Sequence, residues 1–347
     1  MNNVSKFSSS QILSMHRPEQ LFKPVEIKAQ LLTLRKCWHP DFNNSTNAKD
    51  VFHKIETLYK QAKEKITNDA WGAAGSITFE TKEGSQYKFK FQKEHSIDTG
   101  TMYIGKQRII FHTKSEYEDL ADDAYLLLRK ILGGTGKFFE GNKQFLPAYT
   151  DEFSTDQGHY LLIPKPPTYI LLNDLLNAVN EKINTDQVAW IISSMYNFAT
   201  YLETQDIVHN EFTEHTYFVD VTIHSGMLLG GWFYSVKKDA PLKALPKYIA
   251  DLYPSSWLLK KTATSKADSF FIKATGLKLL GDPSKTGMAL MRDATIPEPM
   301  ITFLRQPPGR SVLDDYTYWY DVVLKESYGK PKFRKFTQPY KDIYKGI

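Results

Sequence analysis

The sequence of 347 residues contains a single cysteine, Cys37. One cysteine cannot form a disulfide within the chain, and it cannot supply the several thiolates of a cysteine-based zinc site. Apolar residues never persist for the roughly 18 positions that a membrane-spanning helix requires. The first residues also lack the apolar stretch of a secretory signal peptide. We therefore expect a cytoplasmic protein in a reducing environment, with no membrane partner.

The chain also has little excess of charge of one sign. Lys and Arg number 44 against 39 Asp and Glu, a net charge of +5 that does not define the whole protein as a nucleic-acid binder. The balance differs along the chain, however, with +4 in residues 1–70, −4 in residues 71–324 and +5 in residues 325–347. Two basic ends therefore flank an acidic middle.

Residues 1–70 have the pattern of a small helical unit. Apolar positions recur at near-helical spacing in Val25–Trp38 and again from about residue 47 to 66. A shorter helix is expected at Ser10–Met15. Between the two longer helices, Pro40 disfavours helical backbone at the residue before it and so marks a loop.

This loop contains the sequence Trp38-His39-Pro40-Asp41 and follows a helix with several basic residues. The arrangement over residues 26–66 resembles the J domain of DnaJ-type co-chaperones. The resemblance implies docking on a DnaK-type chaperone and stimulation of its ATP hydrolysis, with a charge-assisted bond from the aspartate to an arginine of the partner. It assigns chaperone binding to Lys28, Arg35, Lys36, His39, Pro40 and Asp41.

Beyond a plausible linker at Trp71–Gly75, the pattern changes to strands followed by helices. Alternating apolar and polar residues predict strands around Ile77–Phe79, Tyr87–Phe91, Met102–Ile104, Arg108–His112 and Tyr160–Pro164. An amphipathic helix is predicted at Tyr117–Leu132, and helices dominate from Leu171 onward. Strands and helices that are segregated in this way predict an α+β fold.

The segment His209–Asp220 follows an amphipathic helix, Asp186–Thr204, and precedes an apolar run, Met227–Val236. This order resembles the catalytic-loop region of the protein-kinase fold, and the resemblance extends over about residues 76–329. It implies a bilobal kinase-like domain at 71–347, after a J-like domain at 1–70. Its parts would be a strand-rich N-lobe at 71–170, a helical C-lobe at 171–324 and a basic aromatic tail at 325–347.

The N-lobe positions that this resemblance implies depart from an active kinase. Gly100 is the one glycine retained in the glycine-rich loop. His112 stands at the position of the phosphate-binding lysine, with Lys114 as a poorly matched substitute. Asp122 and Asp123 lie on the helix that would carry the pairing glutamate. Phosphoryl transfer therefore has no clear lysine in this lobe.

The C-lobe positions depart in the same way. Glu211 replaces the catalytic aspartate, Thr213 the lysine two residues later and Thr216 the metal-binding asparagine. The metal-binding aspartate aligns with Gly230 or Gly231, which have no side chain. Losing both metal ligands removes several kcal/mol of charge stabilisation. The resemblance retains three structural positions, which are His209, Asp268 and Arg310.

We therefore expect a co-chaperone in which the kinase-like domain is a catalytically inactive module that binds an unknown client protein, without cofactor or metal. The combination resembles DnaJ-like proteins of bacteria and their phages, and the chaperone could belong to either cell. An alternative is an atypical kinase or nucleotide transferase that uses Glu211 as a base. Another alternative is nucleic-acid binding through the tail, which can instead pack on the C-lobe. The tail interleaves Lys330, Lys332, Arg334, Lys335, Lys341 and Lys345 with Tyr328, Phe333, Phe336, Tyr340 and Tyr344.

Overall fold

The computed structural model describes residues 4, 7–15, 17–43, 45–67, 71, 75–80, 84–156, 158–330, 332–340 and 343–344. Helices come first, followed by sheets and then by further helices, which confirms the predicted mixture of helix and strand. Among the described residues, no helix has both the length and the apolar character needed to cross a membrane.

The N-terminal unit consists of α1 (Ser9–Ser14), α2 (Ile27–Trp38) and α3 (Ala48–Thr67). Ser8 begins α1 with a capping box, in which its hydroxyl accepts from the Gln11 amide. The two longer helices share one core with α1, and α3 buries the apolar face that its spacing predicts. For α2 the predicted face needs correction, because Val25 and Leu32 are exposed and the helix is turned so that Leu31 and Leu34 reach the core. The core includes Ile12, Leu31, Leu34, Val51, Ile55, Leu58 and Ala62.

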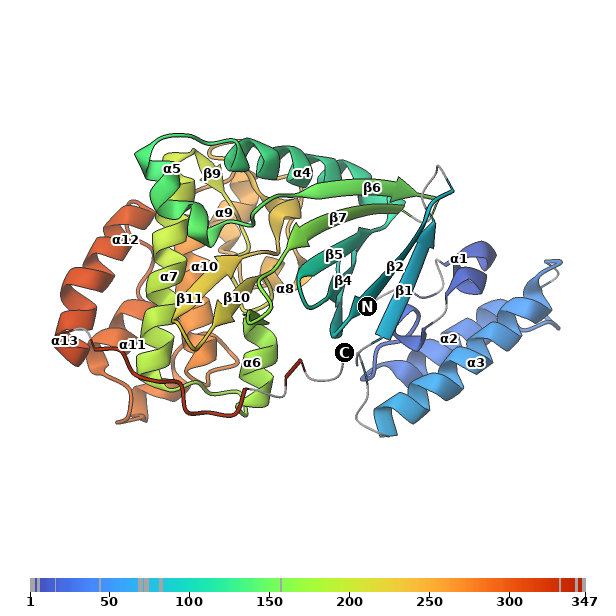
Figure 1. Cartoon of the computed structure of the whole chain (residues 1–347). Helices are drawn as coiled ribbons and strands as arrows, with labels where there is room; N and C mark the ends of the chain where they lie inside the picture. Colours follow the sequence, from blue (N-terminus) through green and yellow to red (C-terminus); the bar gives the residue numbers. More distant parts are fainter. Residues whose placement is uncertain are drawn as a thin grey trace.

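Strands occupy the middle of the chain. β1 (Gly75–Glu80) and β2 (Gln86–Phe91) form an antiparallel hairpin beside the helical unit (Figure 1). A five-stranded antiparallel sheet follows, with the spatial order β3-β4-β5-β7-β6. Its strands are β3 (Lys93–Ile97), β4 (Gly100–Ile104), β5 (Arg108–Thr113), β6 (Asp151–Thr155) and β7 (Gly158–Pro164).

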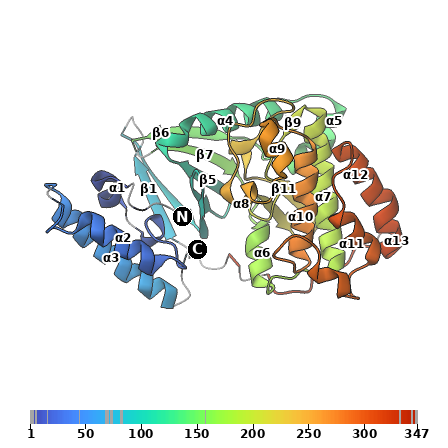
Figure 2. The ribbon, with the colours of Figure 1, turned by 180° about the vertical axis from the view of Figure 1, so that it is seen from behind.

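One face of the five-stranded sheet is covered by α4 (Glu118–Leu132), which is seen above the strands from both sides (Figures 1 and 2). Its residues Leu120, Ala124 and Leu128 are buried at helical spacing and belong to the same core as Phe111. The short helix α5 (Lys137–Asn142) follows. The predicted helix at 117–132 is therefore confirmed.

The C-terminal half is mostly helical. The buried helix α7 (Thr185–Thr204) packs against α10 (Lys266–Leu279) and α12 (Val312–Tyr318). The other helices are α6 (Leu172–Ala178), α8 (Lys247–Ala250), α9 (Ser255–Lys260), α11 (Glu298–Arg305) and α13 (Leu324–Tyr328). Short strands lie between them: β8 (Ile170–Leu171), β9 (Ile207–Val208), β10 (Tyr217–Asp220), β11 (Ser225–Leu228) and β12 (Val236–Lys237).

Candidate functional site

The first candidate site is the loop between α2 and α3, at the end of the helical unit that points away from the C-terminal helices (Figures 1 and 2). The His39 amide closes α2 by donating to the Arg35 carbonyl, and Pro40 then turns the chain. The Asp41 amide donates to His39 Nδ1 over 3.2 Å. The Asp41 side chain is 76% exposed, so its carboxylate is open to a partner.

Two ring contacts and a hydrogen bond hold this loop against the helices. The His39 ring lies 5.3 Å from the ring of Phe52 on α3 and 5.7 Å from that of Phe42. The Asn43 side-chain amide donates to the Cys37 carbonyl over 2.8 Å, which satisfies one of the free carbonyls at the end of α2. Asp41 is therefore presented on a supported loop.

The basic residues of α2 differ in their surroundings. Arg35 forms a bidentate ion pair with Glu56 of α3, with Nε–Oε1 at 2.6 Å and Nη2–Oε2 at 2.7 Å. Arg35 thus joins the two helices, and its charge is partly balanced inside the unit rather than free for docking. Lys28 and Lys36 are exposed and face solvent.

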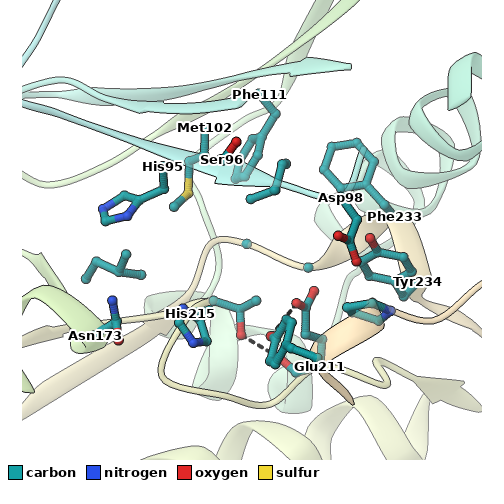
Figure 3. A pocket seen from close by; sticks show the side chains of 17 residues that line it. His95, Ser96, Asp98, Met102, Phe111, Asn173, Glu211, His215, Phe233 and Tyr234 are labelled. Carbon is teal, nitrogen blue, oxygen red and sulfur yellow. Dashed lines mark hydrogen bonds between the residues drawn. The ribbon is translucent and has the colours of Figure 1, made fainter. Parts of the chain in front are cut away.

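The second candidate site is a cavity of about 300 Å³ between the five-stranded sheet and the C-terminal helices. Figure 3 shows His95, Met102 and Phe111 projecting into it from the strands, opposite Glu211 and His215. No lysine or arginine is among the described residues that line it. The lining residues are His95, Ser96, Ile97, Asp98, Met102, Phe111, Leu171, Asn173, Glu211, His215, Thr216, Gly230, Gly231, Phe233, Tyr234, Pro246 and Tyr248.

The floor of the cavity is fixed by Asp268 at the start of α10. Its carboxylate accepts from the backbone amides of His209 and Asn210, at 3.0 and 2.8 Å. Burial lowers the pKa of His209 to about 3, so the imidazole is neutral. Its Nε2 donates to the Gly230 carbonyl over 3.0 Å, while Nδ1 accepts from the Glu211 amide over 3.2 Å. These bonds tie the loop after β9 to the loop after β11.

Glu211 presents its carboxyl group to the cavity, and Tyr248 Oη donates to its Oε1 over 2.5 Å. Burial raises the pKa of Glu211 to about 8, and the nearby Asp98 and Glu214 carboxylates act in the same direction. Glu211 therefore holds a proton at neutral pH and is poorly suited to act as a general base there.

Thr213 and Thr216 both bond within the same loop. Thr216 Oγ1 donates to the carbonyl of Glu211 and also lies 3.2 Å from the carbonyl of Thr213. The Thr213 hydroxyl lies 2.9 Å from Tyr248 Oη. These hydroxyl groups support the loop backbone and the tyrosine instead of pointing as a pair of ligands into the cavity.

Packing and backbone conformation require glycine at one of the two positions that were predicted for the metal ligand, and the other position is tightly packed. A Cβ at Gly231 would lie 2.6 Å from Glu211 Oε2 and equally close to His209 Cε1. Gly231 also has φ +77°, a backbone conformation that L residues rarely adopt. At Gly230, a Cβ would lie 3.1 Å from the Thr216 Cα. A carboxylate therefore cannot replace Gly231 without moving the loop.

On the sheet side, the prediction for His112 needs correction. Side chains alternate along β5, so Phe111 lines the cavity and its ring lies 5.6 Å from that of Phe233. His112 points to the opposite face, where its ring stacks on Tyr160 at 4.6 Å. Gly100 lies where β4 meets β5, and a Cβ there would be 1.9 Å from the His112 carbonyl oxygen. The apolar ring of Phe111 therefore faces the cavity from β5, where His112 had been predicted to stand in place of the lysine.

Two further predicted positions lie outside the cavity. Asp123 on α4 forms an ion pair with Lys243, in the segment between β12 and α8. Arg310 is exposed and forms no ion pair with a residue that the structure describes. A buried ion pair at 3.0 Å joins Lys273 of α10 to Asp315 of α12.

Sequence reasoning missed the role of Tyr344 in the tail. Its hydroxyl accepts from the Leu171 amide over 3.0 Å and donates to Asp174 Oδ2 over 2.8 Å. The same carboxylate oxygen lies 3.1 Å from His95 Nε2 on β3. The tail therefore connects the sheet to the start of α6, close to the cavity. Only the aromatic composition of the tail could have suggested such a contact.

Other aromatic residues of the tail pack on the C-terminal helices. Phe336 is buried, and its ring lies 5.6 Å from that of Tyr340. Phe333 stacks on His224 with ring centroids 4.2 Å apart. This packing agrees with a C-terminal arm laid on the helical lobe. The predictions for Lys341 and Lys345 lie outside the described residues.

Comparison with known proteins identifies no relative, since no family model matches the chain and no curated protein matches its sequence.

Proposed function

We propose that the chain is a DnaJ-like co-chaperone that stimulates a DnaK-type chaperone through His39, Pro40 and Asp41. The observation that carries this proposal is the exposed carboxylate of Asp41 on a supported loop between two packed helices. Its position at the free end of the helical unit leaves room for a large partner (Figure 1).

The surface of α2 supports docking on an acidic protein. Lys28, Leu32 and Lys36 follow one another at intervals of four residues, which places them on one face of the helix. Leu32 is 59% exposed, and both lysines are exposed beside it. Such a stripe combines long-range attraction to carboxylates with an apolar contact at its centre. The carboxylate of Asp41 would then pair with an arginine of the partner.

The test is the steady-state ATPase rate of purified DnaK with the full chain added. We expect wild-type protein to raise this rate and Asp41→Asn to abolish at least about 90% of the stimulation, since the charge-assisted bond is lost. Asp251→Asn is the matched control because Asp251 is an exposed aspartate of the C-terminal half. Equal stimulation by Asp41→Asn and wild type would refute the proposal.

We further propose that residues 71–347 form a bilobal kinase-like module without phosphoryl-transfer activity. A five-stranded sheet with one covering helix, a cavity below it and the loop braced by Asp268 support this arrangement. Phe111 in the cavity, the protonated Glu211 and the crowded Gly231 support the lack of activity. The module would bind a client protein.

A thermal-shift titration with ATP and Mg²⁺ separates this module from an active kinase. A ligand that binds only the native state stabilises it by RT ln(1 + L/Kd), where L is the free ligand concentration, so the effect grows as L rises above Kd. We therefore expect no rise in Tm at millimolar ATP, with an active kinase measured in parallel. A Tm that rises steadily with the logarithm of ATP concentration, and that no longer rises in Glu211→Gln, would instead favour an enzyme that uses Glu211.

A further inference from the structure

Three ligand-type side chains from three different elements meet at one end of the five-stranded sheet, outside the cavity described above. His159 lies on β7, Glu152 on the neighbouring edge strand β6 and Asp122 on α4. One ligand atom from each lies within 4.8 Å of the others. Thirty or more residues separate Asp122 from the strands, so no sequence spacing pointed to this cluster.

The histidine at its centre is almost completely buried. His159 is 3% exposed, and its Nδ1 lies 3.2 Å from Ser154 Oγ on the opposing strand. Its Nε2 lies 3.1 Å from Glu152 Oε2. His159 Nε2 and Glu152 Oε2 are both buried, yet neither atom makes a hydrogen bond of acceptable geometry to a described residue. Two buried polar atoms therefore face each other with their bonding capacity unused.

The neighbouring serine indicates what lies between them. When the Ser154 hydroxyl accepts from Nδ1–H, the lone pair of Nε2 faces the Glu152 carboxylate. Two electron-rich atoms in this position repel each other unless a cation joins them. Bonds from zinc to imidazole nitrogen and to carboxylate oxygen are about 2.0 to 2.2 Å, so adjacent ligand atoms on one ion are roughly 3 Å apart. The separation of Nε2 and Oε2 has this value.

The surrounding charges favour a cation. Burial lowers the pKa of His159, against the effect of the Asp122 and Glu118 carboxylates. Burial also raises the pKa of Glu152, as do Asp122 and Asp151, while Arg129 lowers it. Burial thus works against a charged histidine paired with a charged glutamate. Four carboxylates face one arginine here, which leaves negative charge for a metal ion to balance.

We propose that His159, Glu152 and Asp122 bind one divalent transition-metal ion, of which Zn²⁺ is the natural probe. His159 supplies Nε2, and the Ser154 hydroxyl beside its other nitrogen fixes the orientation of the ring, as such hydrogen bonds do for metal-binding histidines. Asp122 Oδ1 lies 3.8 Å from His159 Nδ1, and its side chain is 58% exposed. This exposed carboxylate would turn towards Nε2 to close over the ion from the solvent side, where water completes the coordination. The ion would tie α4 to the edge of the sheet.

The experiment uses the tag-free full chain after treatment with EDTA, titrated with ZnCl₂ in a calorimeter. We expect one ion per chain and a rise in Tm on binding. Asp122→Asn and Glu152→Gln should each weaken the affinity at least about tenfold, a loss seen even for outer-shell partners of metal ligands. Asp119→Asn, an exposed aspartate of the same helix, should bind like wild type.

Asp122 is exposed, so its variant tests ligation without disturbing the core. Failure to bind Zn²⁺ would overturn the proposal and mean that a proton bridges His159 and Glu152. Binding that is equally tight in Asp122→Asn and Glu152→Gln would also overturn it, because the ion would lie elsewhere. Neither result depends on DnaK, so the outcome is independent of the proposed co-chaperone function.

Discussion

Glu211 illustrates how the environment of one residue can decide its chemistry. The carboxyl group lies at the floor of a cavity where a base would be useful, yet it is enclosed by Tyr248, His209 and Gly231. Burial favours its neutral form, so the group retains a proton near pH 7. A carboxylic acid in this state donates or shares a hydrogen bond more readily than it removes a proton from a substrate.

This protonation makes the stability of the protein depend on pH. The pKa of Glu211 is raised from 4.5 to about 8 on folding, so the native state binds more protons than the unfolded state between these values. The free energy of unfolding should therefore fall as the pH rises through this window, by up to about 1.4 kcal/mol per pH unit. Glu211→Gln resembles the neutral acid and should flatten the dependence.

Urea denaturation of both proteins at pH 5, 6, 7 and 8 measures this slope. Glu64→Gln is the control, because Glu64 is an exposed residue of α3 and its loss should leave the slope as in wild type. Identical slopes for wild type and Glu211→Gln would contradict a buried, protonated Glu211.

Predictability at the residue scale depended on the regularity of the surroundings. His209 and Asp268 could be proposed as structural positions only through the resemblance to the kinase fold, and the structure joins them by the bond from the His209 amide to Asp268. His112 could not be placed correctly, because a shift of one position along β5 exchanges the two faces of the sheet. The ion pair of Arg35 with Glu56 depends on how two helices are rotated against each other, which composition does not reveal.

At the scale of helices and strands, segments with one regular apolar face could be predicted from the sequence, whereas segments without a regular apolar pattern could not. The helices α3 and α4 have strong apolar periodicity, and the packing of that face determines where they lie. Strand β3 has the sequence Lys-Glu-His-Ser-Ile, which lacks the alternation of a typical strand. Its pairing with β4 supplies the backbone hydrogen bonds, so its place becomes apparent only in three dimensions.

The tail is the element whose contribution is most easily measured. Tyr344→Phe removes a hydroxyl that bonds to the Leu171 amide and to Asp174. We expect a loss of about 1 to 3 kcal/mol in the free energy of unfolding, because the Leu171 amide loses its acceptor in a buried place and Asp174 keeps only His95. Chemical denaturation measures the loss, and hydrogen exchange at Leu171 should become faster.

Tyr149→Phe provides the comparison for this variant, since Tyr149 is 50% exposed and lies before β6. The two variants lose the same atom, so the difference between them isolates the buried bonds. Equal stability of Tyr344→Phe and Tyr149→Phe would mean that the tail does not hold the cavity together.

At the scale of the whole molecule, charged side chains join the helical unit to the sheet. Arg17 pairs with Glu94 on β3, and its guanidinium lies 4.6 Å from the centre of the Phe91 ring. Glu19 pairs in turn with Lys65 of α3. Arg17 and Glu94 are 77 residues apart in the sequence, and each lies in an ordinary polar stretch. The order of helices before strands could be predicted, but the contact between the helical unit and the sheet could not.

The contacts of strand β3 bear on which fragments of the chain are useful in experiments. Its neighbouring residues Glu94 and His95 reach in opposite directions, one to the N-terminal unit and the other to the residues that hold Tyr344. This short strand thus contributes to the attachment of both ends of the polypeptide. A fragment made by cutting the chain near residue 70 or residue 330 would lose the contacts that one of these two side chains makes. Isolated fragments are therefore poor substitutes for the intact protein in binding experiments, and negative results from them would say little.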